Sequence, residues 1–346
     1  MARHRIGIVG LGMAVTPHAK SLLDLKDRVK VAHAFSPSEA RRKAFAARYP
    51  FPVAQSMDTV LSDESVDAVL ILTPPNTHLQ LVRLAVEAGK HVLLEKPLDI
   101  STKRSEALVA ACHAAGRKLG IVLQHRFRPA GVRLRQLIAA EELGAIVAAS
   151  AGIRLWRPQS YYDEPGRGTK ERDGGGVLLT QGIHTLDLMI SIAGEAAEVT
   201  SYVRTTPIHR METEDLVCAA VQFRNGAIGT IEATTAAYPG FPERIEVICR
   251  KGSATISGTE LKVHWADGWT QEIGADATPG GTGADPMAFP HDYHRALIVD
   301  FLDAIDRDRE PAVNGEEALK VHRLIDALLA SGATGRPASV AEPVNG

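Results

Sequence analysis

The chain has few cysteines and almost no net charge. Cys112, Cys218 and Cys249 are its three cysteines, and they lie far apart in the 346 residues. Such spacing provides neither a disulfide framework nor a clustered metal motif, so we expect free thiols and a reduced, cytoplasmic environment. The formal net charge of −2 offers no electrostatic attraction to nucleic acid or to an anionic membrane.

Long apolar runs are also absent. None approaches the roughly 20 residues that a membrane-spanning helix needs, and the run at residues 6–9 ends at Gly10. The composition, with 45% apolar and 23% charged residues, is that of an ordinary globular protein. The length suits two domains of about 150 residues each, and we expect neither a membrane nor a nucleic-acid partner.

Residues 1–125 alternate short apolar runs with helical patterns. The runs are rich in Val, Ile and Leu, which is typical of strands buried on both faces of a sheet. Alternation of such strands with helices predicts an α/β domain built on a doubly wound parallel sheet. The expected strands are Ile6–Val9, Val29–Phe35, Val66–Leu72, His91–Leu94 and Lys118–Leu123.

Three helix starts are expected in this domain. Thr16-Pro17 and Ser36-Pro37 each place a hydroxyl before a proline, which favours a capped helix with proline at its first position. Asn76 is the expected cap of the helix that runs to about Ala88.

Residues 126–346 form the second expected domain. Longer strand-like runs joined by turn signals such as Asn225-Gly226 predict a largely antiparallel sheet, with a helix from about Gly175 to Ile192 between them. The segment 157–173 is an extended loop, and loops of that length are often functional. The expected strands are Ala145–Trp156, Val199–Arg204, Leu216–Phe223, Ala227–Thr234 and Arg244–Ile248, and the closing helices are His291–Arg307 and Glu316–Ala330.

A glycine-rich turn follows the first expected strand. Gly10, Gly12, Met13 and Ala14 lead into a helix, and glycines there allow a pyrophosphate to approach the N–H groups of that helix. Val15 stands where the dinucleotide-binding pattern G-x-G-x-x-G/A has its third small residue. A strand–GxG–helix order favours dinucleotide binding over a purely structural turn.

The end of the second strand carries no acid that could bind a ribose 2′-hydroxyl. Ser36 stands there instead, followed one helical turn later by Arg41 and Arg42. A hydroxyl with a guanidinium suits a 2′-phosphate, which favours NADP slightly over NAD. The alternative is that Ser36 only caps a helix and the arginines form a solvated face.

Glu95, Lys96 and Pro97 end the fourth expected strand. A lysine there lies at the carboxyl end of a parallel strand, where open α/β sheets bind ligands, and the proline restricts the backbone that follows. The alternative is a surface Lys-Pro pair that opens a loop.

A second chemical segment surrounds residue 180. Gly174-Gly175-Gly176 precedes Thr180, Gln181 and His184, which share one side of an α-helix by their spacing. His184 could therefore face a pocket with polar neighbours. The alternative is a histidine packed in the core, although a triglycine permits close approach of a ligand.

Taken together, the sequence resembles the glucose–fructose oxidoreductase / inositol dehydrogenase (Gfo/Idh/MocA) family over nearly its whole length. The resemblance is carried by the GLG turn, Thr73–His78, Glu95-Lys96-Pro97, Arg126-Phe127-Arg128-Pro129, the triglycine helix with His184, and the helix containing Asp300-Phe301 and Ala304-Ile305.

The resemblance implies an NAD(P)-dependent oxidoreductase that acts on a carbohydrate or polyol hydroxyl. It implies a Rossmann domain, an α+β second domain with an open-faced, mainly antiparallel sheet, and homodimers or homotetramers formed through that sheet. By position, Lys96 matches the family's catalytic lysine and His184 its catalytic histidine. Thr180 stands where the family often has an aspartate.

These residues suggest a mechanism. His184 takes the proton of the alcohol, because an imidazole titrates near neutral pH. Lys96 stabilises the developing negative charge on the oxygen and shares the proton transfer. Thr180 orients His184 by a hydrogen bond, and Glu95 positions Lys96 or the coenzyme.

The remaining candidates complete the expected site. The coenzyme set also includes Thr73, Pro74, Asn76, His78 and Gln124, with a helix-surface role as the alternative for His78. The substrate set is Arg126, Arg157, Tyr161, Tyr162, Gln181 and His184, with Tyr238 and Arg244 as weaker candidates; the alternative for the two adjacent tyrosines is that they pin the loop.

No metal site is expected. His291 and His294 could be interpreted as a metal pair, but no clustered carboxylate or cysteine supports them, and a capping or surface role is favoured.

Two other functions remain open. The same fold could act on a non-sugar cyclic diol or carbonyl. It could also be a non-catalytic sensor of dinucleotides, because a fold does not guarantee catalysis. Lys96 and His184 argue against the sensor, whereas Thr180 and Val15 leave room for it.

Overall fold

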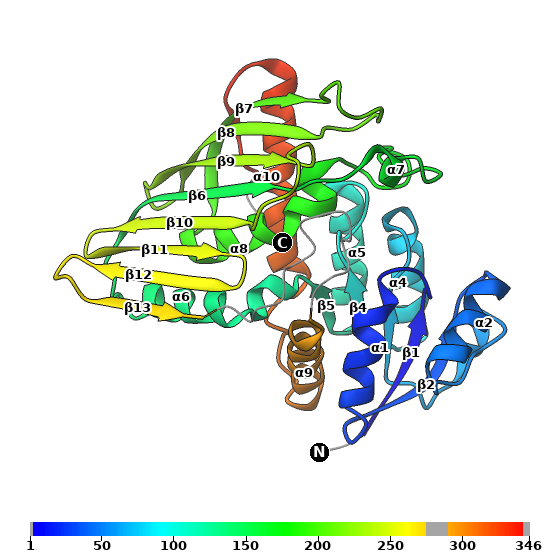
Figure 1. Cartoon of the computed structure of the whole chain (residues 1–346). Coiled ribbons are helices and arrows are strands. Elements are labelled where there is room, and N and C mark those ends of the chain that lie inside the picture. Colours follow the sequence, from blue (N-terminus) through cyan, green and yellow to red (C-terminus); the bar gives the residue numbers. More distant parts are fainter. Residues whose placement is uncertain (1–2, 275–289, 342–346) are drawn as a thin grey trace. The chain divides into compact units, whose positions relative to one another are not determined.

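The computed structural model describes residues 3–274 and 290–341. The chain forms two compact units (Figure 1). Unit 1 contains the described residues up to Gln124 together with Pro290–Leu319, and unit 2 contains those of 125–289 and 320–346. Residues 290–319, which the sequence-based division places in the second domain, pack in unit 1.

Unit 1 is built on a parallel five-stranded sheet, which confirms the predicted fold class of this part. The strand order is β2-β1-β3-β4-β5, and every neighbouring pair is parallel. Strands β3 and β5 are buried along their whole length, in keeping with their continuous apolar sequences. The bounds are β1 (His4–Val9), β2 (Val29–Phe35), β3 (Ala68–Ile71), β4 (His91–Glu95) and β5 (Leu119–Val122).

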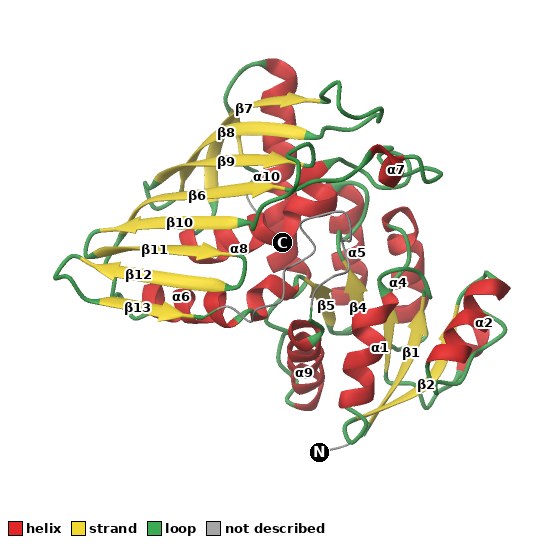
Figure 2. Ribbon diagram, in the orientation of Figure 1, coloured by secondary structure: helices red, strands yellow, loops and turns green. Residues whose placement is uncertain are grey.

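Most helices of unit 1 connect these strands, and the segment 290–319 adds α9 and the start of α10. Figure 2 shows them as red ribbons around the short yellow strands. The bounds are α1 (Val15–Asp24), α2 (Glu39–Arg48), α3 (Met57–Ser62), α4 (His78–Glu87), α5 (Thr102–Ala114) and α9 (Asp292–Asp306), with the 3-10 turns η1 (Pro75–Thr77) and η2 (Gln124–Phe127); α10 (Gly315–Thr334) starts in unit 1 and continues into unit 2.

The three predicted helix starts were wrong in detail. Helix α1 begins before Thr16, with Ala14 at its N-cap position. Helix α2 is capped by Ser38, whose hydroxyl accepts a hydrogen bond from the Arg41 N–H at 3.4 Å, because Ser36 still belongs to the extended segment after β2. Asn76 lies inside η1, so α4 starts after it and without a side-chain cap.

Unit 2 is built on a nine-stranded sheet with the order β13-β12-β11-β10-β6-β9-β8-β7-β14. Only β6 and β9 pair in parallel among these neighbours, so the predicted mainly antiparallel sheet is confirmed. The bounds are β6 (Ile146–Arg154), β7 (Ala196–Arg204), β8 (Leu216–Phe223), β9 (Ile228–Thr234), β10 (Arg244–Cys249), β11 (Gly252–Ser257), β12 (Glu260–Trp265), β13 (Thr270–Ile273) and β14 (Ala338–Ser339).

One face of this sheet is covered by helices (Figure 2). The covering helices include α6 (Pro129–Ala139) and α8 (Ile183–Ala193), and the short α7 (Gln159–Tyr162) lies in the loop after β6. Burial alternates along β10, as expected for a strand with one covered face. On the other face, Tyr202, Ile228 and Ile248 are 72%, 64% and 56% exposed. The sheet is therefore open on that side.

The helix expected from Gly175 to Ile192 has a different start. Residues Leu178–Gly182 form a π-helical turn, η3, and α8 continues from it. In the described part of the chain, no helix combines the length and the apolar character needed to cross a bilayer.

Candidate active site

The glycine-rich turn lies between β1 and α1. Gly10 has φ +106°, and a Cβ there would lie 2.6 Å from the backbone of Leu72, so only glycine fits beside the end of β3. Ala14 at the N-cap of α1 provides no side-chain cap. The first turn of α1 thus has the form that binds a pyrophosphate through backbone N–H groups.

The two arginines after β2 differ in their contacts. Arg42 donates to the carbonyl oxygens of Ser36 and Pro37 at 2.7 and 3.2 Å, which fixes the segment between β2 and α2. Arg41 is exposed, and its Nη1 lies 3.8 Å from where a Cβ on Gly12 would stand. Arg41 therefore reaches the glycine-rich turn, whereas Arg42 maintains the local backbone.

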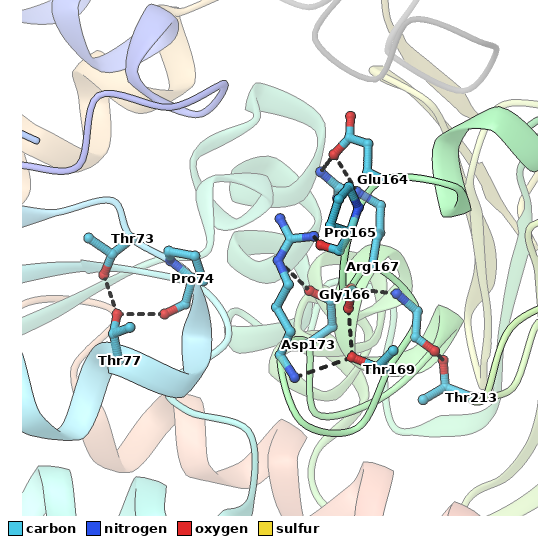
Figure 3. A network of polar contacts seen from close by, with 12 residues as sticks. Thr73, Pro74, Thr77, Glu164, Pro165, Gly166, Arg167, Thr169, Asp173 and Thr213 are labelled. Carbon is cyan, nitrogen blue, oxygen red and sulfur yellow. Dashed lines mark hydrogen bonds and ion pairs between the residues drawn. The ribbon is translucent and has the colours of Figure 1, made fainter. Parts of the chain in front are cut away.

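The turn after β3 is held by its own hydroxyls (Figure 3). The Thr77 hydroxyl donates to the Pro74 carbonyl at 2.7 Å, and it lies 2.7 Å from the Thr73 hydroxyl. Because Thr77 has one hydroxyl proton, Thr73 donates to Thr77. The Thr73–Thr77 segment is therefore a preformed structure at the carboxyl edge of the sheet.

His78 is fully buried, so its predicted alternative role on a helix surface was wrong. Its Nε2 lies 2.8 Å from the Thr73 carbonyl, and its Nδ1 lies 3.0 and 3.1 Å from the carbonyls of Pro97 and Leu98. Burial lowers the pKa of His78, while these carbonyls oppose that shift. The ring connects the turn after β3 to the turn after β4.

Lys96 follows β4 and is partly buried, whereas Pro97 and Leu98 are buried. The Lys96 N–H donates to Oε2 of Glu95 at 3.1 Å, and Oε1 of Glu95 lies 2.8 Å from Nε2 of His18. The alternative of a surface loop at this motif was wrong, because the backbone after Lys96 enters the interior.

His294 was wrongly expected to cap a helix or lie on the surface. It is buried on α9, and its ring packs against that of His18 with centroids 4.9 Å apart. His291 pairs with Asp24 at 2.9 Å. His18, Glu95 and His294 each offer one ligand atom, all within 4.8 Å of one another, a cluster capable of metal binding that the sequence spacing did not reveal.

In unit 2, the start of the η3–α8 segment is held by Glu214. Its carboxylate accepts hydrogen bonds from the N–H groups of Gly176 and Leu178 at 3.0 and 3.1 Å. A Cβ at Gly176 would overlap the Glu214 carbonyl oxygen, which explains the glycine. Burial raises the pKa of Glu214. Glu214 was not predicted, because it lies far along the chain from this segment, just before β8.

Thr180 lies within the π-helical turn. Its hydroxyl donates to the Gly176 carbonyl at 2.6 Å and also contacts Oε1 of Gln181. The predicted shared face with His184 assumed α-helical spacing, which this turn does not have. The orientation of His184 by Thr180 stays a prediction.

His184 is partly exposed at the start of α8. The ring of His125 stacks on it with centroids 4.8 Å apart and an interplanar angle of 30°. Nδ1 of His125 lies 3.8 Å from Oε2 of Glu243, and Nη1 of Arg128 lies 3.7 Å from the same oxygen. His125 and Glu243 were not predicted, although His125 adjoins the Arg126–Pro129 motif. The Glu243 carboxylate thus lies beside His125, and His125 in turn stacks on His184.

Arg126 forms a buried, two-pronged ion pair with Asp187 of α8. Nε and Nη2 of Arg126 donate to the two carboxylate oxygens at 2.8 and 2.6 Å, and Asp187 has no exposed surface. This geometry fixes the η2 turn to α8. A substrate contact by Arg126 stays a prediction beside this structural role.

The loop 157–173 is an ordered network (Figure 3). The Tyr161 hydroxyl accepts hydrogen bonds from Arg167 at 2.8 Å and from Gln181 at 3.4 Å. Arg157 is buried with its guanidinium 5.8 Å above the Tyr161 ring, and burial lowers the pKa of Arg157. Tyr162 is buried and bonds to Thr235, in keeping with a loop-pinning role.

The other candidates are more scattered. Tyr238 is 75% exposed and packs edge-on against Trp156. Arg244 pairs with Glu246 on an exposed strand position. Gln124 is buried, and its Oε1 has no hydrogen-bond partner among the described residues. Met13 is half-exposed in the glycine-rich turn.

Comparison with known proteins identifies the family. Residues 4–122 match the oxidoreductase family with an NAD-binding Rossmann fold, GFO_IDH_MocA, and residues 132–255 match the GFO/IDH/MocA C-terminal domain. A D-xylose 1-dehydrogenase (NADP(+)) of Haloferax volcanii is 27% identical over 95% of this chain and 97% of its own. The inositol 2-dehydrogenase of Rhizobium meliloti is 26% identical over 97% and 99%.

A solved structure extends this similarity to the whole fold. The WlbA dehydrogenase of Bordetella pertussis, in complex with NADH and UDP-GlcNAcA, is 27% identical with a TM-score of 0.84, covering 99% of this chain and 100% of its own. The protein is therefore an NAD(P)-dependent oxidoreductase that belongs to the Gfo/Idh/MocA family.

Proposed function

We propose that the enzyme transfers a hydride between NAD(P) and a secondary alcohol or carbonyl of a sugar, a polyol or a sugar derivative. The names of the relatives support this substrate class, because they include a xylose dehydrogenase and an inositol dehydrogenase. The single observation that carries the proposal is the position of Lys96 at the carboxyl end of β4, on the same sheet edge as the glycine-rich turn.

Unit 1 would hold the coenzyme. The residues that fit this role lie mainly in the two turns after β1 and β3, with Arg41 beside the first turn. The proposed set is Gly10, Gly12, Met13, Ala14, Ser36, Arg41, Thr73, Pro74, Asn76 and Gln124. When bound, the nicotinamide accepts or donates the hydride. The protein supplies binding groups, orientation and proton handling.

Lys96 is the proposed hydrogen-bond donor to the reacting oxygen. During alcohol oxidation that oxygen gains negative charge as its proton leaves, and a fixed ammonium stabilises such charge. The backbone of Lys96 is held before it by Glu95 and after it by the contacts of His78 with Pro97 and Leu98. This fixed backbone supports a defined position for the ammonium group.

His184 is the proposed base that takes the alcohol proton. An imidazole can accept and return a proton near neutral pH. The stacked His125 restricts the ring, and Nδ1 of His125 lies 3.8 Å from Oε2 of Glu243. This arrangement could fulfil the role of the aspartate that relatives often carry where Thr180 stands.

Substrate binding is proposed for the loop 157–173 and its neighbours. The candidates that belong to this loop or to the η3–α8 segment are Arg157, Tyr161, Tyr162, Gln181 and His184. Hydroxyl, amide and guanidinium groups of this kind suit the many hydroxyls of a sugar.

A turnover screen tests the proposal. Purified enzyme is offered NAD(P)⁺ with sugars, inositols, sugar acids and, as the competing class, aromatic dihydrodiols, and nicotinamide reduction is followed by absorbance. Turnover of polyhydroxylated substrates is expected. Saturable coenzyme binding without turnover of any member would support the sensor function instead.

NADP is the proposed coenzyme, because Arg41 lies exposed beside the glycine-rich turn. Titration with NADH and NADPH, read by nicotinamide fluorescence, distinguishes the two. Tighter binding of NADH would contradict the assignment. For a substitution of Arg41, Lys43→Ala provides the control, since Lys43 lies on the same helix and pairs with Glu39.

The open face of the nine-stranded sheet is the proposed contact between subunits. Tyr202 and Ile228 lie exposed there, and exposed apolar groups gathered on one face mark interaction surfaces. Light scattering of wild type and of Ile228→Glu tests this: the variant should have the lower mass. We also propose a cytoplasmic location, in keeping with three free cysteines.

A further inference from the structure

A chain of contacts that starts at a buried histidine ends on the backbone of Lys96. His18 on α1 has no exposed surface, and its Nε2 lies 2.8 Å from Oε1 of Glu95. The other oxygen of Glu95 accepts a hydrogen bond from the Lys96 N–H at 3.1 Å. His294 of α9 packs edge-on against His18, with the ring planes at 89°. Three elements distant in sequence therefore converge on the residue before the proposed catalytic lysine.

The two oxygens of Glu95 have separate partners. Oε2 accepts the hydrogen bond of the Lys96 N–H, and Oε1 lies 2.8 Å from Nε2 of His18, which is assigned as its donor. Nδ1 of His18 has no hydrogen-bond partner among the described residues. The Nε2 atom of His18 is therefore directed at the Glu95 carboxylate, which packing of the ring alone would not require.

We propose that His18 is a positioning residue for Lys96: it holds Glu95, and Glu95 holds the Lys96 backbone. The edge-on contact with His294 restricts rotation of the His18 ring. The inference rests on the proposed function, because it presumes that the ammonium of Lys96 contacts the reacting oxygen.

The location of His18 gives this role a further consequence. Helix α1 begins directly after the glycine-rich turn, and His18 is its fourth residue. The same helix therefore presents its first N–H groups to the coenzyme and carries His18. The position of Lys96 is thereby tied to the element that binds the pyrophosphate. Loss of the His18–Glu95 bond should impair turnover and leave coenzyme binding intact.

Two substitutions separate the hydrogen bond from packing. His18→Phe keeps an aromatic ring but removes the donor, whereas His18→Gln places an amide N–H near the former Nε2. Since a misplacement of about 1 Å can cost about 10²-fold in rate, we expect His18→Phe to lower kcat at least ~10-fold with the Kd of NADPH within ~3-fold of wild type. His18→Gln should restore kcat to within ~3-fold of wild type.

His4→Phe is the matched control. His4 is also buried in unit 1 and bonds a carboxylate through Nε2, to Asp306 at 2.9 Å, but it lies at the amino end of β1. It should lower the thermal unfolding midpoint and leave kcat unchanged. Equal losses of kcat in His4→Phe and His18→Phe would overturn the proposal, because they would reflect general destabilisation.

A second measurement does not depend on turnover. Hydrogen exchange at the Lys96 amide, followed by NMR, should accelerate in His18→Phe and not in His4→Phe, since Glu95 is released only in the first. Unchanged exchange, or unchanged kcat in His18→Phe, would overturn the positioning role. Failure of the proposed function would instead appear as wild-type turnover of Lys96→Met.

Metal analysis of the purified protein provides the last outcome. His18, Glu95 and His294 could place three ligand atoms around one ion. A stoichiometric transition metal lost on His18→Phe substitution would overturn the proposal, because the residues would then serve as ligands. A metal-free enzyme with full activity would support it.

Discussion

Removal of Asp187 should destabilise unit 2 because it leaves the Arg126 guanidinium buried without its main counter-charge. Two hydrogen bonds of 2.8 and 2.6 Å join these side chains, and Asp187 is fully buried. Breaking a buried ion pair at one partner costs about 3–5 kcal/mol. Asp187→Ala should therefore lower the free energy of unfolding by about that amount, roughly a 10²- to 10⁴-fold change in the unfolding equilibrium.

Tryptophan fluorescence during urea unfolding is the appropriate assay. All three tryptophans, Trp156, Trp265 and Trp269, lie in unit 2, so their signal reports on the unit that contains the ion pair. The double variant Arg126→Met with Asp187→Leu should recover most of the loss, because apolar replacements of a buried pair are often neutral.

Two results would refute this reasoning. The first is an Asp187→Ala variant whose unfolding free energy stays within about 0.5 kcal/mol of wild type, the range of ordinary surface substitutions. The second is an Arg126→Met variant of normal stability with a KM raised tenfold or more. That result would assign Arg126 to substrate binding, as the sequence suggested.

Three further predictions concern other parts of the chain. Arg41→Ala should weaken NADPH binding by at least ~10-fold and leave NADH binding nearly unchanged, since a charge-assisted hydrogen bond contributes about 1.5–3 kcal/mol; fluorescence titration checks this. Burial lowers the pKa of His91 to about 4, and its Nδ1 accepts the Lys118 N–H. The unfolded chain, with a His pKa of about 6.5, then binds the extra proton between pH ~6.5 and ~4, so stability falls as pH falls through that window; NMR titration and urea midpoints test it. Gly176→Ala should markedly lower the urea midpoint, because its methyl group overlaps the Glu214 carbonyl.

The strands of unit 1 were predictable because most of their residues are buried, and β3 and β5 are continuous apolar runs buried along their whole length. The strands β11 to β13 were missed. They are short and only half-covered, and polar residues such as Ser253, Thr255 and Lys262 alternate with small or apolar ones. In such strands the pairing with neighbours decides the structure more than the local sequence does.

The candidate site was predictable only where its residues are close in sequence. The turns that contain Gly10 and Lys96, and the helix start that contains His184, follow local patterns of glycine, proline and strand ends. The contacts of His18 with Glu95, and of His125 with His184, join distant segments and leave no spacing signal. The π-helical turn before α8 likewise begins at a long-range contact, in which the Glu214 carboxylate accepts hydrogen bonds from the N–H groups of Gly176 and Leu178.

The central claim is that Lys96 handles the reacting oxygen of a polyhydroxylated alcohol. The most direct test is the turnover number of Lys96→Met at saturating NADP⁺ and substrate, with coenzyme affinity measured in parallel and the exposed Lys103→Met as control. Loss of a positioned acid–base group typically costs 10²- to 10⁴-fold, so we expect at least a ~10²-fold loss with unchanged NADPH affinity. Wild-type turnover in Lys96→Met would contradict the account.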